Sequence, residues 1–75
     1  MTMEDRLLQT LRSVFGDDLH ELKDADGLGT ITGWDSAGHL SLIMALEAEF
    51  QVEFETDDFA ELVNIGAIRK RLAEE

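Results

Sequence analysis

The fold is decided by residues 33–50, which read GWDSAGHLSLIMALEAEF. This stretch predicts a helix from Ser36 to Phe50, because serine favours the N-cap of a helix and apolar residues follow at helical spacing. One face of the helix is expected to enter the core, and its positions are Leu42, Ile43, Leu46 and Phe50. A long helix with a core-facing stripe of this kind indicates an all-α domain.

The same helix is more apolar than one core-facing stripe requires. A second stripe lies on a different face and consists of Ala37, Leu40 and Met44, with Glu47 beside them. Two alternatives stay open for Leu40 and Met44. They pack under the preceding loop, or they remain exposed as a docking patch.

Before this helix, the chain predicts a first helix from Met3 to Phe15, because Thr2 and Asp5 have the spacing of a capping arrangement. Its inward positions are Leu7, Leu11, Val14 and Phe15. A long irregular stretch follows, from Gly16 to Asp35, and we expect its isolated apolar residues to hold it against the core. These residues are Leu19, Leu22, Leu28 and Ile31.

After the long helix, residues 50–54 alternate like a strand, but no second strand is predicted to pair with them, so we expect an extended connector. Thr56 predicts the cap of a short helix from Asp57 to Val63, and Asn64 predicts the cap of a last helix. The inward positions of these two helices are Phe59, Leu62, Val63, Ile65, Ile68 and Leu72. The predicted fold is all-α: a small four-helix bundle with three main helices, one short helix and a long loop between the first two.

The size and charge of the chain narrow the function classes. Its 75 residues predict one domain, residues 1–75, whose small core leaves little room for a deep enzyme cleft. Seventeen acids face six bases, and the formal net charge is −11. Such a field repels phosphate backbones and anionic lipid, so we expect no nucleic-acid partner and no membrane insertion, whereas basic protein surfaces are attracted.

The absence of cysteine and the pattern of the N-terminal residues bear on the chemistry and the cellular compartment of the protein. The chain has no cysteine, which excludes disulfides and thiolate chemistry. Residues 1–15 are amphipathic with early acids rather than basic and then apolar, so they do not read as a signal peptide. We expect a cytoplasmic protein that looks like a complete, discrete chain.

Ser36 is the sharpest candidate for chemistry. A serine at a helix start presents its hydroxyl beside unpaired backbone N–H groups, where a phosphodiester would be favoured by those donors and by the helix dipole. The alternative is that Ser36 serves only as an N-cap, and on the residue alone this alternative is the better interpretation.

A serine hydrolase is a distant alternative. Only His20 and His39 could act as bases, and both are predicted to be surface or boundary side chains. Residues 33–37 do not form a G-x-S-x-G elbow. Residues 24–35 resemble a calcium loop only loosely, since position five of such a loop would be Leu28 and position twelve Asp35 rather than glutamate. We therefore expect neither an enzyme nor a specific metal site.

The motif Gly33-Trp34-Asp35-Ser36, followed by the run from Leu40 to Phe50, resembles the second helix of acyl carrier proteins. The similarity extends over most of the chain, through its length, its acidity, the first helix, the long loop and the last helix. It implies an acyl-carrier-like bundle without catalysis of its own. It also implies that a phosphopantetheinyl transferase, using magnesium and coenzyme A, attaches a 4'-phosphopantetheine arm to Ser36. The thiol of that arm would carry an acyl group as a thioester.

The same resemblance assigns expected roles around the serine. Asp35 would help the transferase, and partner enzymes with basic docking surfaces, which load and process the acyl group, would bind a monomer through the face of Leu40, Met44 and Glu47. Ala37 stands where a bulky aliphatic residue is usual in this family, which weakens the expected anchor for partners. Ser41 and Ala48 occupy places that are often acidic there, so the partner-facing charge is thinner.

The pathway is open between fatty acid, polyketide and other specialised biosynthesis. Trp34 before the Asp-Ser pair resembles carriers that serve specialised pathways, which implies a dedicated carrier. The competing hypothesis is an unmodified, acidic helical interaction module that docks a basic partner through Leu40 and Met44.

Overall fold

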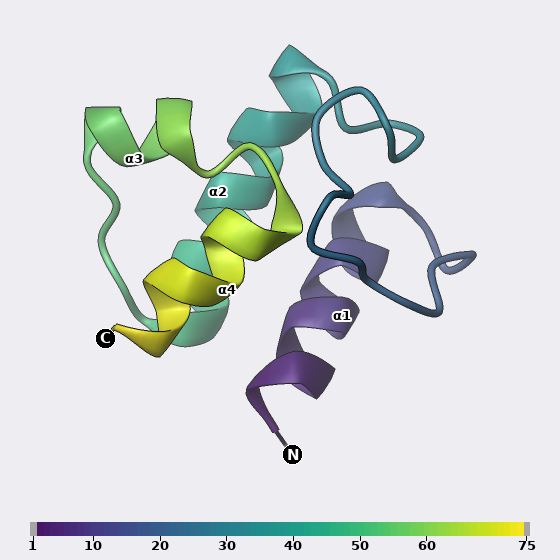
Figure 1. The fold of residues 1–75 in the computed structure, drawn as a ribbon, viewed down its shortest axis with the longest axis horizontal. Helices are drawn as coiled ribbons and strands as arrows, with labels where there is room; N and C mark the ends of the chain where they lie inside the picture. Colours follow the sequence, from purple (N-terminus) through teal and green to yellow (C-terminus); the bar gives the residue numbers. More distant parts are fainter. Residues whose placement is uncertain (1, 75) are drawn as a thin grey trace.

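The computed structural model describes residues 2–74, and these form four helices and no strand. They are α1 (Met3–Phe15), α2 (Ser36–Phe50), α3 (Thr56–Glu61) and α4 (Ile65–Ala73). Figure 1 shows α1 and α2 running in opposite directions, joined by the long loop, with α4 in front of α2 and α3 on the side of α2 away from α1. The predicted all-α fold is confirmed, with three main helices, one short helix and the long loop in its expected place. None of the described helices is long and apolar enough to cross a membrane.

Local capping explains where the helices begin. Thr2 and Asp5 close the predicted capping box of α1, and the Asn64 side chain accepts from the Ala67 N–H at 2.8 Å to start α4. The predicted Thr56 cap of α3 is wrong, because Thr56 is already helical and Glu55 is the last extended residue. The Glu55 N–H donates to the Asp58 carboxylate at 2.9 Å, which fixes this start one residue earlier.

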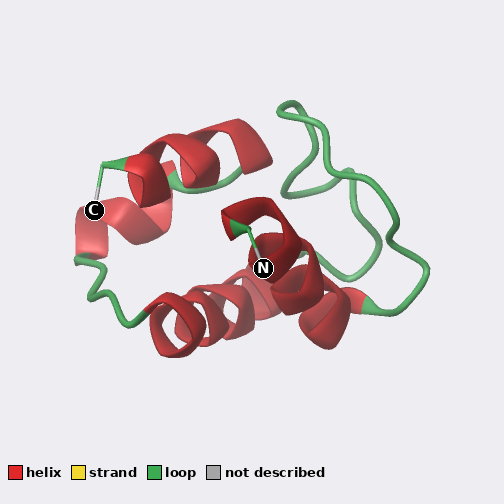
Figure 2. Ribbon diagram, turned by 90° about the horizontal axis from the view of Figure 1, so that it is seen from below, coloured by secondary structure: helices red, strands yellow, loops and turns green. Residues whose placement is uncertain are grey.

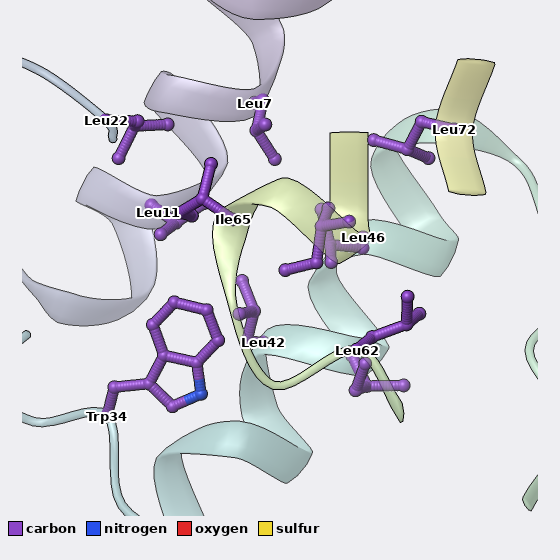
Figure 3. Close-up of a cluster of buried hydrophobic side chains, with 11 residues drawn as sticks. Leu7, Leu11, Leu22, Trp34, Leu42, Leu46, Leu62, Ile65 and Leu72 are labelled. Atoms are coloured by element: carbon purple, nitrogen blue, oxygen red, sulfur yellow. The ribbon is translucent and has the colours of Figure 1, made fainter. Parts of the chain in front are cut away.

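Figure 2 shows α4 facing α2, with α1 beside them, and the core side chains drawn in Figure 3 lie between these three helices. Its members are Leu7, Leu11, Leu22, Trp34, Leu42, Ile43, Leu46, Leu62, Ile65, Ile68 and Leu72. The inward stripe of α4 is confirmed in full, and that of α2 is confirmed except that Phe50 is only partly buried. The extended connector after α2 is also confirmed, and it begins at Gln51, whose left-handed φ of 54° turns the chain.

The short helix contributes less to the core than predicted. None of its residues is buried, and Leu62, the residue after it, supplies the buried side chain. Phe59 was predicted to point inward, but its side chain is 36% exposed. The reason is that its ring packs on a side chain of α2 at the edge of the bundle, with centroids 4.7 Å apart, rather than in the core.

The long loop is held by main-chain contacts as well as by apolar side chains. Gly27 forms an isolated bridge with Asn64, and the Leu28 N–H donates to the Val63 carbonyl at 2.9 Å. A Cβ on Gly27 would lie 2.2 Å from that carbonyl, so only glycine permits this approach. Of the apolar loop residues, Leu22 is buried, whereas Leu28 is 45% exposed and its predicted packing is wrong. The main-chain bridge fixes the position of Leu28 without burying its side chain.

Arg69 ties three distant segments together. Its guanidinium donates to the Glu4 carboxylate at 2.8 Å, to Asp24 in the long loop, and to the Leu22 carbonyl at 2.8 Å. Its hydrogen bonds with Glu4 and Asp24 raise the pKa of the Arg69 guanidinium above its ordinary value. This contact links α4 to the start of α1 and to the loop.

We expect Arg69→Gln to lower the free energy of unfolding by about 1 kcal/mol at low salt, since partly exposed ion pairs contribute little more than that. The loss should shrink as salt screens the pairs. Urea melts at two salt concentrations measure both values. Lys70→Gln, on the exposed side of α4, is the matched control and should change neither. An Arg69→Gln loss that is independent of salt would show that packing of the side chain, rather than charge, is responsible.

Candidate functional site

Ser36 is the first helical residue of α2, and Asp35 is its N-cap. Asp35 is extended, and its Oδ1 accepts from the Gly38 N–H at 2.8 Å. The prediction that Ser36 is the N-cap is therefore wrong. The backbone turns helical one residue earlier than that prediction required, so the capping oxygen comes from the aspartate.

This shift leaves the Ser36 side chain free for chemistry. Ser36 is exposed, and its hydroxyl makes no hydrogen bond to any residue between 2 and 74. The N–H groups of Ser36 and Ala37 also lack an acceptor within the described chain, as is usual for the first turn of a helix. Unpaired N–H groups at a helix start favour a negative charge, so a phosphodiester on this hydroxyl fits its surroundings.

Gly38 sets the position of the first turn of α2. A Cβ on Gly38 would lie 2.1 Å from the Gly33 carbonyl oxygen and 3.0 Å from a ring carbon of Phe15. The turn that carries Ser36 therefore packs main chain to main chain against the end of the loop. Gly33 itself has a φ of 91°, a left-handed conformation that favours glycine. Both glycines thus fix where Ser36 is presented.

Beneath this turn, four rings form an aromatic row, which comprises Phe15, Trp34, His39 and Phe59. Phe15 and Trp34 stack with centroids 5.4 Å apart, and Trp34 and His39 stack at 6.0 Å. The row runs from the end of α1 through the loop and α2 to α3. It joins every segment around the start of α2.

His39 is the central member, and it is buried, with 3% of its surface exposed. The prediction that it is a surface or boundary side chain is wrong, whereas His20 is exposed as predicted. His39 lies three residues before Leu42 and seven before Leu46, so it falls on the core stripe of α2. That spacing, together with the nearby indole of Trp34, was the sequence signal that could have placed it.

Two hydrogen bonds define the proton position on His39. The Trp34 indole N–H, which can only donate, lies 3.0 Å from His39 Nδ1. The Phe59 carbonyl, which can only accept, lies 2.7 Å from Nε2. His39 is therefore neutral with its proton on Nε2. Because both ring nitrogens are engaged, His39 is not available as a base for Ser36.

The second stripe of α2 is exposed. Leu40 is 52% and Met44 is 61% exposed, and Ala37 is exposed as well, so these residues do not pack under the loop. Glu47 is different, because its carboxylate accepts from the Phe54 N–H at 2.9 Å and is partly buried against the connector. The structure thus brings Ser36, Leu40 and Met44 onto one open face, with Asp35 exposed at its end. Among residues 2–74, no group of three or more histidine, aspartate or glutamate side chains is placed so that it could hold a metal ion.

These features define a small acidic helical domain that presents a free serine at a helix start. The family model called phosphopantetheine attachment site matches residues 5–72, and the chain belongs to this family. The family is defined by a covalently attached 4'-phosphopantetheine, which is the cofactor here, so the protein is a phosphopantetheine-carrying carrier protein. Such carrier domains are generally not catalysts themselves and interact with phosphopantetheinyl transferases and acyl-processing enzymes. No solved structure matches the chain.

Proposed function

We propose that the chain is a single carrier domain, residues 1–75, that bears its 4'-phosphopantetheine on Ser36 and carries an acyl group as a thioester on that arm. One observation supports this most directly. Ser36 is an exposed hydroxyl without a hydrogen bond to the described residues, while Asp35 does the capping that would otherwise occupy it. The domain itself performs no catalysis, and partner enzymes act on the arm.

Asp35 has two tasks in this proposal. Its Oδ1 holds the Gly38 N–H and so keeps the first turn of α2 in place. The rest of its exposed carboxylate lies beside Ser36, where a transferase that brings coenzyme A and magnesium would meet it. Magnesium prefers oxygen ligands, which makes this carboxylate suitable for the encounter.

The partner face consists of Ala37, Leu40, Met44 and Glu47. Two large exposed apolar side chains on a chain with a formal net charge of −11 suit a partner with a basic rim and a small apolar pocket. Such a contact associates quickly and exchanges quickly, which repeated transfer of an acyl group requires. The partners are the transferase and the acyl-loading and acyl-processing enzymes of a fatty acid, polyketide or other specialised pathway. The protein works in the cytoplasm as a monomer, without nucleic acid or membrane insertion.

Intact-mass spectrometry after incubation with coenzyme A, magnesium and a broad-specificity phosphopantetheinyl transferase tests the proposal. We expect the wild-type mass to rise by one phosphopantetheine, and Ser36→Ala to gain nothing, because the acceptor oxygen is gone. Ser41→Ala is the matched control, since Ser41 is another exposed serine of α2, and it should be modified like the wild type. Modification of Ser36→Ala would place the arm elsewhere.

The exposed pair Leu40 and Met44 also favours a second candidate, an unmodified interaction module that docks a basic partner. Failure of the folded wild type to gain mass, in a mixture that modifies another carrier protein, would favour this candidate.

A further inference from the structure

We infer that the acyl cargo of this carrier stays outside the helical bundle, and that its cargo class is therefore a short or polar acyl group. The inference rests on the proposed function of Ser36. It follows from the aromatic row, which closes the bundle next to Ser36 and is joined by hydrogen bonds across three segments.

The row lies at the end of the core, to which Trp34 itself belongs, next to Ser36 in the chain. Trp34 precedes Ser36 by two residues and His39 follows it by three, and both are buried, at 1% and 3% exposed. Figure 3 shows Trp34 at the end of the core cluster near the start of α2, with its ring nitrogen directed toward that helix. An apolar chain that folded back from Ser36 toward Leu42 would have to displace these rings.

Displacement would break both hydrogen bonds of His39. The Trp34 indole N–H would lose its acceptor at 3.0 Å, and the Phe59 carbonyl would lose its donor at 2.7 Å. An alkyl chain offers neither a donor nor an acceptor in exchange, and unpaired buried polar groups are unfavourable. Among the described residues, no buried side-chain nitrogen or oxygen lacks a partner, so no polar group awaits a ligand inside the bundle.

Main-chain atoms also close the bundle where the end of the loop meets the first turn of α2. The Gly33 carbonyl oxygen lies so close to Gly38 that a Cβ there would approach it to 2.1 Å. Main-chain atoms cannot move aside like the end of a flexible side chain without shifting the whole turn. The route between the loop and α2 is therefore blocked as well.

A cargo that stays in water must tolerate water. A long alkyl chain left exposed would seek other apolar surfaces and promote association, because apolar area in water is unfavourable. Short acyl groups and acyl groups with polar substituents avoid this cost. The closed row thus selects the class of cargo that the carrier can hold as a soluble monomer.

The test compares the wild-type carrier loaded with acetyl, octanoyl or dodecanoyl groups. Thioester cleavage by hydroxylamine, the melting temperature and the indole N–H resonance of the single tryptophan are measured for each. We expect the same cleavage rate, melting temperature and indole resonance for all three cargoes. If cleavage of the dodecanoyl thioester were about tenfold slower than that of the acetyl thioester and the indole resonance were shifted, the inference would be overturned. A tenfold difference corresponds to ~1.4 kcal/mol of protection of the thioester from hydroxylamine.

Trp34→Leu provides the matched variant, because it removes the indole N–H and opens space beside His39. In a folded Trp34→Leu carrier, dodecanoyl cleavage should become slower than acetyl cleavage. Equal rates in that variant would show that the row is not the barrier. If the variant does not fold, the comparison of the three cargoes on the wild-type carrier still tests the inference.

Failure of this inference can be separated from failure of the proposed attachment. The chain has no cysteine, so Ser36→Cys introduces one unique thiol that takes alkyl groups of different length as mixed disulfides without any transferase. Unchanged melting temperature and indole resonance across those lengths support a closed bundle. A rise in melting temperature with chain length contradicts it, whether or not Ser36 is the natural attachment residue.

Discussion

Leu46→Ala is expected to leave much of the chain unfolded under native conditions. Leu46 is fully buried in the core, and truncating a buried leucine lowers the free energy of unfolding by about 2–5 kcal/mol. A domain of this length has only ~3–5 kcal/mol to lose. The effect has two causes. The removed side-chain atoms no longer contribute the free energy of leaving water, and a cavity is left between α1, α2 and α4. Urea denaturation followed by circular dichroism measures it.

Met44→Ala is the matched control two positions away on the same helix. Met44 is 61% exposed, so its truncation should change the free energy of unfolding by no more than ~0.5 kcal/mol, as for most surface substitutions. Its effect should instead be weaker binding of partner enzymes. Equal and large losses of stability in the two variants would show that Met44 belongs to the core and that the second stripe is not a docking face.

Gly38→Ala is expected to be the most disruptive small change near Ser36. The added Cβ would meet the Gly33 carbonyl oxygen at 2.1 Å, which forces the first turn of α2 away from the loop. Overpacking of this kind costs about 1–3 kcal/mol, which outweighs the roughly 1 kcal/mol that alanine gains over glycine in a helix. Displacement of the turn should also slow modification of Ser36. Thermal melts and the time course of the mass shift measure the two effects.

Gly66→Ala makes the same substitution in the first turn of α4. Its nearest neighbour would be the Cβ of Asp24 at 3.2 Å, so the contact requires a shift of only a few tenths of an ångström. The stability of this variant should stay within about 1 kcal/mol of the wild type, because helix propensity offsets the tight contact. If Gly38→Ala proved as mild as Gly66→Ala, the close packing of the loop on α2 would be refuted.

The main helices were predictable because their signals are local. The bounds of α1 and α2 follow from capping residues next to or at their first turn and from the apolar spacing along each helix. The start of α2 shows the limit of such signals. Asp35 and Ser36 are both good capping residues, and only the backbone conformation decides that Asp35 caps and Ser36 is left free.

The surroundings of the serine were less predictable, because they depend on contacts between distant segments. His39 contacts Phe59 twenty residues away, and no periodic pattern encodes a hydrogen bond to that carbonyl. The exposure of Leu28 follows from a main-chain bridge to the α3–α4 connection, which side-chain hydrophobicity does not reveal. The face of Leu40 and Met44 was recognised as a second stripe, but its exposure was settled only once the position of the loop was known.

The burial of Trp34 gives the protein a built-in optical probe. The chain contains a single tryptophan, so its ultraviolet emission comes from one site, with the indole stacked between Phe15 and His39. Any event that pulls the loop from the start of α2 would expose the ring to water and shift that emission toward longer wavelength. Such a displacement of the loop can therefore be followed in real time by fluorescence with no label attached, whereas loading with a cargo that stays outside the bundle should leave the emission unchanged.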